Sequence, residues 1–487
     1  MVTMATIRSL LVLISLVGFV CGDPFFGNNY QIPQSSELVR SANLVVTNLN
    51  AARNAVSSYG RNPPAASVSL NRGARVLADY VGNVSQLIGN VYSQLSRAAT
   101  DRTTDPAVVF SKISTQINAL RPLLQNSSVY VESLAAYFDY EGDNSTSCFF
   151  TEQNNGMKID IEKLSTILQN VSRVVDSIAG QSLNTQQFIA VLSVNGLLQN
   201  LVDATQRAAI ASNEYMGIIT RYVAAINDAN SVRLTVNSRL QTSRNAINSA
   251  VNSYISSSNS SFNSILSSTD SLFNHLKTLN ESFVFRWPLL LSDRVESKLA
   301  LLNSSIENLI TNLHFRRSVV DNHYSLTGAI FRTSNEALAY LEEEAELLTR
   351  VLANAVNPNS CASNFRNQFY NLPGSVQSLL SQCFTSQLNL ERQGANQVQS
   401  IANNFLRSYV TVVYANAEIC FSHPFDQMSK CLDDFVDTID FGGKFFLLET
   451  TTFYLFEQVQ SELTNCSSRL VSYIRNVGLR ANCQRNP

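Results

Sequence analysis

The sequence predicts an all-α protein of long amphipathic helices, in an elongated bundle or coiled-coil-like arrangement that ends in a disulfide-stapled helical hairpin. Three observations lead to this fold class. Apolar residues recur every three or four positions over long stretches, as they do in amphipathic helices. Runs that resemble strands are scarce, because β-branched residues are scattered. Six of the eight cysteines lie beyond residue 360.

The N-terminus predicts a secretory signal peptide over residues 1–22. Arg8 supplies a positive charge, residues 9–20 form an uninterrupted apolar run, and small or tolerated residues precede Asp23. This run of about a dozen residues is too short for a spanning helix of about 20 residues. Because Asn, Ser and Thr interrupt every later apolar run, we expect a secreted, extracellular protein with no integral membrane span.

Composition and turn residues divide the mature chain into three regions. Residues 23–156 form an N-terminal helical region, residues 157–356 a long Asn/Ser-rich helical or coiled-coil-like region, and residues 357–487 a six-cysteine helical module. Breaks between helices are expected where turn residues cluster: Ser57–Ser67, Ala99–Ala107, Asp139–Gly156, Ala179–Asn184, Phe285–Leu290 and Asn357–Cys361.

The middle region shows long helical phasing. Ser258 and Thr269 occupy seam positions that apolar residues would fill in a regular coiled coil, so any coiled coil is imperfect. Glu346 precedes Arg350 by four residues, a favourable helical pair, and the acidic run Glu342–Glu344 is expected to face solvent. The phased apolar residues are Ile247, Val251, Tyr254, Phe262, Ile265, Leu272, Leu276, Leu279 and Phe283.

The cysteines near the C-terminus predict a hairpin of two helices joined by disulfides. Cys383 and Cys420 are 37 positions apart, and Cys431 and Cys466 are 35 positions apart. Antiparallel helices of these lengths, on the order of 50 Å each, bring Cys420 beside Cys431 at the turn and leave Cys383 beside Cys466. Gly442–Gly443 is expected to bend or interrupt the second helix. The favoured nested pairs are Cys361–Cys483, Cys383–Cys466 and Cys420–Cys431.

A metal site is the alternative at the turn of this hairpin. Cys420, His423 and Cys431 supply only three ligands, and the chain has no Cys-x2-4-Cys knuckle of the kind that zinc usually requires. Oxidation would also compete for both thiols. We therefore expect a covalent clamp, with no metal and no cofactor.

Cys148 is left over from this scheme. It lies among turn residues, four positions after Asn144, and is expected to be accessible. An interchain disulfide that links a homodimer and a buried free thiol both remain open, with pairing to the distal cysteines as a third alternative.

Eight Asn-x-Ser/Thr triplets support an exported glycoprotein. Each lacks proline at the middle position, and their glycans would mark the solvent-facing sides of helices. The acceptors are Asn83, Asn126, Asn144, Asn170, Asn259, Asn280, Asn303 and Asn465.

The C-terminal module resembles a known family. The spacing C361-x21-C-x36-C-x10-C-x34-C-x16-C483, on helices poor in Gly and Pro, with CFSHPFDQMSKC at the turn, is similar to the TsetseEP domain of secreted insect proteins. The resemblance covers about a quarter of the chain, and the Glu-Pro repeat tail that names the founding type is absent from this sequence. It implies a signal-bearing protein, often associated with the insect gut, in a family with no established enzymatic activity.

No catalytic motif accompanies the four histidines. His-Glu-x-x-His, Gly-x-Ser-x-Gly and phosphate-loop patterns are lacking. The segment HFRRSVVDNH, from His314 to His323, offers a small-anion or heparin-like contact or simply a solvated helix end. Asp433–Asp434 is a weak carboxylate pair, because adjacent helical positions diverge. We expect no catalytic residues and no enzyme.

The charge balance limits the classes of partner that the chain is expected to bind. Charged residues make up 15% of the chain and the formal net charge is −2, so nucleic acid, which demands clustered Lys and Arg, is excluded as a partner. We expect a structural or interaction protein with an extracellular protein or glycan partner. The alternative is a carrier of lipid or small apolar ligands, although helices that lie on lipid usually carry flanking Lys and Arg.

Overall fold

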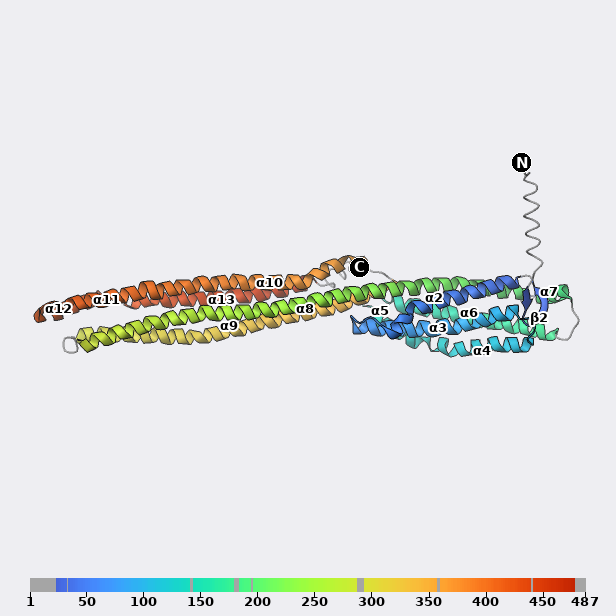
Figure 1. Cartoon of the computed structure of the whole chain (residues 1–487), viewed down its shortest axis with the longest axis horizontal. Helices are drawn as coiled ribbons and strands as arrows, with labels where there is room; N and C mark the ends of the chain where they lie inside the picture. Colours follow the sequence, from blue (N-terminus) through green and yellow to red (C-terminus); the bar gives the residue numbers. More distant parts are fainter. Residues whose placement is uncertain are drawn as a thin grey trace, which may run out of the picture. The chain divides into compact units, whose positions relative to one another are not determined.

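The computed structural model describes residues 23–32, 34–140, 143–178, 184–193, 196–286, 293–356, 360–438 and 441–477. These residues are almost entirely helical (Figure 1), which confirms the all-α class and the long packed helices. The elements are β1 (Asp23–Phe25), β2 (Asn28–Ile32), α2 (Ser35–Arg61), α3 (Val68–Thr100), α4 (Pro106–Gln125), α5 (Ser127–Phe138), α6 (Ser145–Ser177), α7 (Thr185–Ser193), α8 (Leu197–Arg286), α9 (Asp293–Ala353), α10 (Ser360–Gln399), the π-helix η2 (Ser400–Leu406), α11 (Arg407–Cys420), α12 (Phe425–Val436) and α13 (Phe441–Val477).

The chain forms two compact units, each built from segments far apart in the sequence. The first unit comprises the described residues of Met1–Asn237 and Ala345–Arg366, and the second those of Ser238–Glu344 and Asn367–Pro487. The three regions expected along the sequence are consecutive, whereas these units are not, because α8 and α9 each supply residues to both units.

In the first unit, α3 packs against α2, α4 and α5. Apolar residues at helical spacing, such as Leu77, Val81 and Val84 of α3, are fully buried in its core. The Ser67 hydroxyl caps α3 by accepting a hydrogen bond from the Leu70 N–H at 3.1 Å. Helix α3 therefore begins where the turn residues Ser57–Ser67 end, as the sequence predicts.

A two-stranded hairpin precedes the helices, which the sequence did not predict. Phe26 and Gly27 form its turn with φ of 46° and 78°. The Phe26 side chain is buried and its ring stacks on that of Phe110 at 4.8 Å, while its N–H donates to the Ala98 carbonyl at 2.9 Å. A Cβ at Gly27 would lie 2.0 Å from the Thr104 carbonyl oxygen. These tertiary contacts stabilise the hairpin, and no local sequence pattern predicts them.

Helix α6 begins earlier than the sequence suggests. We expected a break throughout Asp139–Gly156, yet α6 starts at Ser145 and continues past Gly156. The Asp139 carboxylate accepts hydrogen bonds from the N–H groups of Thr146 and Ser147 at 2.9 and 3.1 Å. A carboxylate from outside the helix thus satisfies donors of its first turn and permits the early start.

The second unit contains long helices whose directions follow from their contacts. Residue numbers rise together from the Arg239–Tyr370 contact to the Tyr254–Phe384 ring stack, so α8 and α10 run parallel. The Arg239 guanidinium donates to the Tyr370 carbonyl at 3.0 Å, and the two stacked rings are 4.7 Å apart. Helices α10 and α13 run antiparallel, because residue numbers rise from Cys383 to Gly394 on α10 while those of their neighbours on α13 fall from Cys466 to Leu455.

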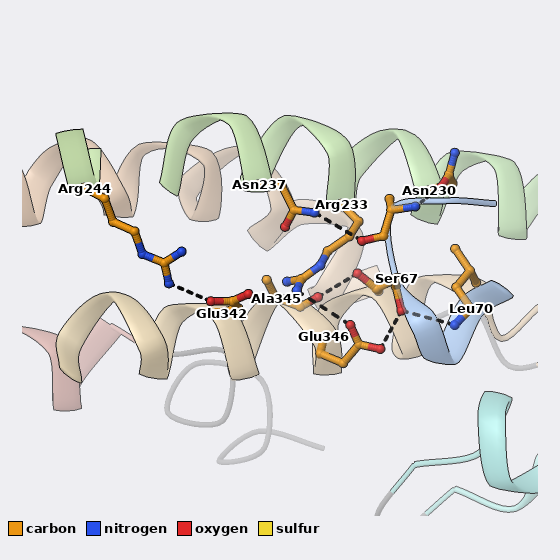
Figure 2. A network of polar contacts seen from close by, with 11 residues as sticks. Ser67, Leu70, Asn230, Arg233, Asn237, Arg244, Glu342, Ala345 and Glu346 are labelled. Carbon is orange, nitrogen blue, oxygen red and sulfur yellow. Dashed lines mark hydrogen bonds and ion pairs between the residues drawn. The ribbon is translucent and has the colours of Figure 1, made fainter. Parts of the chain in front are cut away.

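Two sequence-based expectations about α9 are wrong. Glu344 is 1% exposed rather than solvated. Three successive helical residues cover about 200° of the helix surface, so one of them turns inward. In the second unit, Glu342 accepts a hydrogen bond from Arg244 at 2.7 Å (Figure 2). In the first unit, Glu346 pairs with Arg233 of α8 and with Ser67 (Figure 2), where the sequence suggested Arg350.

Within the part of the chain that the structure describes, no single helix has the length and apolar composition needed to cross a membrane. One bent pair, Thr185–Ser193 with Leu197–Leu279, meets that criterion only when both helices are counted together.

Candidate functional site

The predicted hairpin of the C-terminal module is present in the second unit. Cys383 of α10 is bonded to Cys466 of α13, with the Cα atoms 6.0 Å apart. Cys420, the last residue of α11, is bonded to Cys431 of α12, with a Cα separation of 5.5 Å. Cys361 is also disulfide-bonded. The predicted Cys361–Cys483 link lies outside the described residues, because Cys483 is not among them.

The turn of the hairpin is a covalent clamp and not a set of metal ligands. Both thiols of the imagined metal site, Cys420 and Cys431, are consumed by the disulfide. The N–H of His423 donates to the Cys420 carbonyl at 3.2 Å, and Pro424 precedes the first residue of α12. Within the described residues, no group of three or more His, Cys, Asp or Glu side chains is placed to hold a metal ion.

The second leg of the hairpin, from Cys431 to Cys466, is interrupted beside Gly442–Gly443, as the sequence predicts. Helix α12 ends at Val436 and α13 begins at Phe441, so both glycines lie in the first turn of α13. A helix end tolerates glycine better than a helix interior, because fewer intrahelical hydrogen bonds depend on it there.

The helices α10 to α11 and α13 keep one register along their length. A Cβ at Gly394 would lie 2.2 Å from a methyl carbon of Leu455, so the two helices approach closely at this level. Further along, the Lys444 ammonium lies over the rings of Phe405 and Tyr409, at 5.3 and 5.9 Å from their centroids. These contacts and the Cys383–Cys466 disulfide hold α13 against its partner at three successive levels, and the Cys420–Cys431 disulfide joins α11 to α12 at the turn.

Polar side chains occupy part of the core of the second unit, which sequence reasoning missed. The Tyr254 hydroxyl donates to a carboxylate oxygen of Glu391 at 2.5 Å, and both residues are 1% exposed. Gln387, one turn before Glu391, is equally buried, and its amide nitrogen has no hydrogen-bond partner among the residues that the structure describes. The available signal was the spacing of Phe384, Gln387 and Glu391, which places both polar residues on an apolar helix face.

The structure describes the side chains of His275 and of the paired aspartates. His275 contacts the Thr411 hydroxyl at 3.0 Å, and burial, reinforced by the charge of Arg407, lowers the pKa of its imidazole. The side chains of His314 and His323 lie outside the described residues. Asp433 and Asp434, on α12, are half-buried and exposed.

Most of the predicted glycan acceptors lie within helices, and Asn126 and Asn144 are the residues that precede α5 and α6. Asn170 is half-buried and accepts a hydrogen bond from Arg173 at 3.2 Å. The side chains of Asn280 and Asn303 lie outside the described set. The exposed acceptors are Asn83, Asn126, Asn144, Asn259 and Asn465.

Cys148 is a free and exposed thiol on α6. The expectation of accessibility is therefore confirmed, and the buried free thiol is wrong. Its backbone N–H donates to the Asn144 carbonyl at 3.0 Å, so the thiol and this glycan acceptor are one helical turn apart.

Comparison of the chain with known proteins found no relative. No family model, curated protein or solved structure matches the chain.

Proposed function

We propose that this chain is a secreted, N-glycosylated, non-enzymatic helical protein of the insect gut lumen or extracellular fluid, which presents helical surface to a protein or glycan partner. The observation that carries the proposal is the pair of disulfides, Cys383–Cys466 and Cys420–Cys431. Disulfides of this kind persist in oxidising compartments and are rare in the cytosol. Their spacing is also the feature that resembles the TsetseEP domain.

The positions of the glycan acceptors give independent support. Five acceptors in the two units are exposed, three of them within helices and two, Asn126 and Asn144, at helix caps. A signal peptide over residues 1–22 would deliver the chain to the compartment in which glycans are attached.

Expression of the full chain in insect cells tests the proposal. We expect the protein in the culture medium, beginning at Asp23, with a mobility that increases after enzymatic removal of N-glycans. After alkylation without reduction, mass spectrometry should find the cysteines of the C-terminal module unalkylated, because they are joined in disulfides. The matched control replaces the five exposed acceptor asparagines by glutamine, which should remove most of the mobility shift. Protein retained in the cytosol with reduced cysteines would contradict the proposal.

The partner class needs a separate experiment. Crosslinking of the purified protein in native gut fluid, followed by mass spectrometry, should recover an extracellular protein or a glycoconjugate. Recovery of lipid together with co-flotation on phosphatidylcholine vesicles would instead favour the carrier alternative.

A further inference from the structure

An exposed apolar face lies on the hairpin of the second unit. Eight large apolar side chains of η2, α11, α12 and α13 are between 40% and 75% exposed. We call these residues the hairpin face: Phe405, Val412, Ile419, Phe425, Phe446, Leu447, Phe453 and Tyr454.

The spacing of these residues is that of a helix-packing seam. Phe405, Val412 and Ile419 follow one another at intervals of seven residues, which is close to two helical turns. Leu447 and Tyr454 show the same interval on α13. Each set therefore forms a stripe along one side of its helix.

The two stripes adjoin on the outer side of the helix pair. Lys444 lies over the Phe405 ring, which places these residues at the same level and on the side where α13 meets its partner. Leu447, three residues further along α13, is turned outward next to this contact, because Leu448 faces the core. Since the helices are antiparallel, Tyr454 extends the seam in one direction and Val412 in the other.

The area of the hairpin face is that of a protein interface. A large side chain presents roughly 150–250 Å² when fully exposed, so these residues at their observed exposures present on the order of 800 Å² per copy. The largest apolar patch on a typical monomer is about 300–600 Å². A stable interface buries about 800 Å² on each partner.

We propose that the hairpin face is covered by the same face of a second copy of this chain, related by a two-fold axis. A seven-residue repeat of apolar side chains is the pattern that a helical partner recognises, and a two-fold dimer buries the same surface on both copies. The exposed helix positions near the seam carry both signs of charge. Arg407 supplies positive charge, and Glu418 and Glu457 supply negative charge, so two copies can place opposite charges together.

A lipid surface fits the same face less well. Helices that lie on membranes carry Lys and Arg along the edges of the apolar stripe, whereas α12 carries Asp426, Asp433 and Asp434 near the exposed Phe425. The dimer is independent of the proposed secretion and glycosylation, and goes beyond the proposed function.

Sedimentation equilibrium of the mature chain tests the dimer. We expect about twice the mass of one copy at micromolar concentration, and the same result for Cys148→Ser, since the interface is non-covalent. Val412→Glu with Tyr454→Glu places charges in the seam at positions that are 56% and 70% exposed, so folding should be unaffected. This variant should raise the dimer dissociation constant by at least about 30-fold.

The matched control is Ile210→Glu, which charges a 63% exposed apolar residue of α8 in the first unit. It should leave the dissociation constant unchanged. A monomeric wild-type chain at 50 μM, or a dimer equally stable in the seam variant, would overturn the proposal. A third outcome would also overturn it: the wild-type chain is monomeric in solution and co-floats with phosphatidylcholine vesicles, whereas the seam variant does not co-float. That outcome would assign the face to lipid.

Discussion

Two glycines of α3 show how single residues are constrained by their neighbours. A Cβ at Gly73 would lie 2.8 Å from Cβ of Tyr137 and 2.9 Å from a ring carbon of Phe138, whereas a Cβ at Gly82 would meet no atom within 4 Å. Glycine is therefore required at Gly73 by the close approach of α5, and is merely tolerated at Gly82.

Alanine substitution separates these two roles. We expect Gly73→Ala to lower the free energy of unfolding by about 1–3 kcal/mol through overpacking. Gly82→Ala should raise it by about 0.5–1 kcal/mol, because alanine loses less backbone entropy in a helix. Urea denaturation followed by circular dichroism measures both changes, and effects of the same sign would contradict the packing seen around Gly73.

A carboxylate on α2 makes the first unit sensitive to acid. Glu37 accepts hydrogen bonds from Arg40 and from Gln206 of α8, at 2.6 and 2.9 Å. The hydrogen bond from Arg40, followed by that from Gln206, lowers the pKa of Glu37 to about 2, from 4.5. A lowered pKa in the folded state means that the stabilisation is complete above pH 4.5 and is lost as the pH falls towards 2.

Substitution of this carboxylate should therefore matter less in acid. We expect Glu37→Gln to cost about 1 kcal/mol at pH 6, because solvent screens a side chain that is 31% exposed. The cost should fall below about 0.5 kcal/mol at pH 2. Denaturation curves of both proteins at the two pH values give the difference, and a cost that grows on acidification would rule out the lowered pKa.

At the scale of elements, polar contacts join the helices of each unit unequally. In the first unit, the Arg233 side chain of α8 is 7% exposed and lies 3.8 Å from the Glu346 carboxylate of α9. The same carboxylate accepts a hydrogen bond from the Ser67 hydroxyl at 2.6 Å (Figure 2). In the second unit, Arg244 and Glu342 form a comparable pair whose side chains are 36% and 46% exposed. Burial distinguishes the two pairs.

Removal of each glutamate measures that difference. Glu346→Ala should cost about 2 kcal/mol or more, because it withdraws the counter-charge from a buried guanidinium and a partner from the cap of α3. Glu342→Ala is the matched control on the same helix and should cost less than about 1 kcal/mol. Chemical denaturation of the two variants compares them, and equal costs would show that burial of Arg233 does not carry the effect.

At the scale of the whole chain, covalent links are distributed unevenly between the units. Both fully described disulfides belong to the second unit. The Cys383–Cys466 link joins residues 83 positions apart, and the Cys420–Cys431 link joins residues 11 positions apart. The entropy of loop closure predicts a stabilisation of about 4.5 kcal/mol for the longer loop and about 3 kcal/mol for the shorter one.

Loss of the longer link should therefore weaken the second unit selectively. We expect Cys383→Ser with Cys466→Ser to lower the melting temperature reported by Met428, which lies in the second unit, and to leave Met157 and Met216 of the first unit little changed. Methyl NMR of ¹³C-methionine-labelled protein follows the three signals separately. The double variant at Cys420 and Cys431 should produce a smaller shift, and an equal fall at all three methionines would contradict this assignment.

The sequence by itself determined the helical class and the two described disulfide pairs. Both follow from regular geometry. Apolar residues such as Leu77, Val81 and Val84 recur with the helical period, which predicts the helices. Because the rise per residue is constant, cysteines separated by nearly equal numbers of residues lie at matching levels on two antiparallel helices. The signal peptide, the glycans and the insect-family resemblance are read from the sequence in the same way and stay predictions.

Only the tertiary structure decided where long-range contacts override local signals. Asp139 satisfies the first turn of α6 from outside the helix, Phe26 secures a hairpin by stacking on Phe110, and Glu391 lies in the core, where it accepts a hydrogen bond from the Tyr254 hydroxyl. None of these partners is adjacent in sequence. The exposure of the hairpin face is also known only from the tertiary structure. A seven-residue apolar repeat has the same sequence pattern whether the helix that packs on it belongs to the same chain or to another copy.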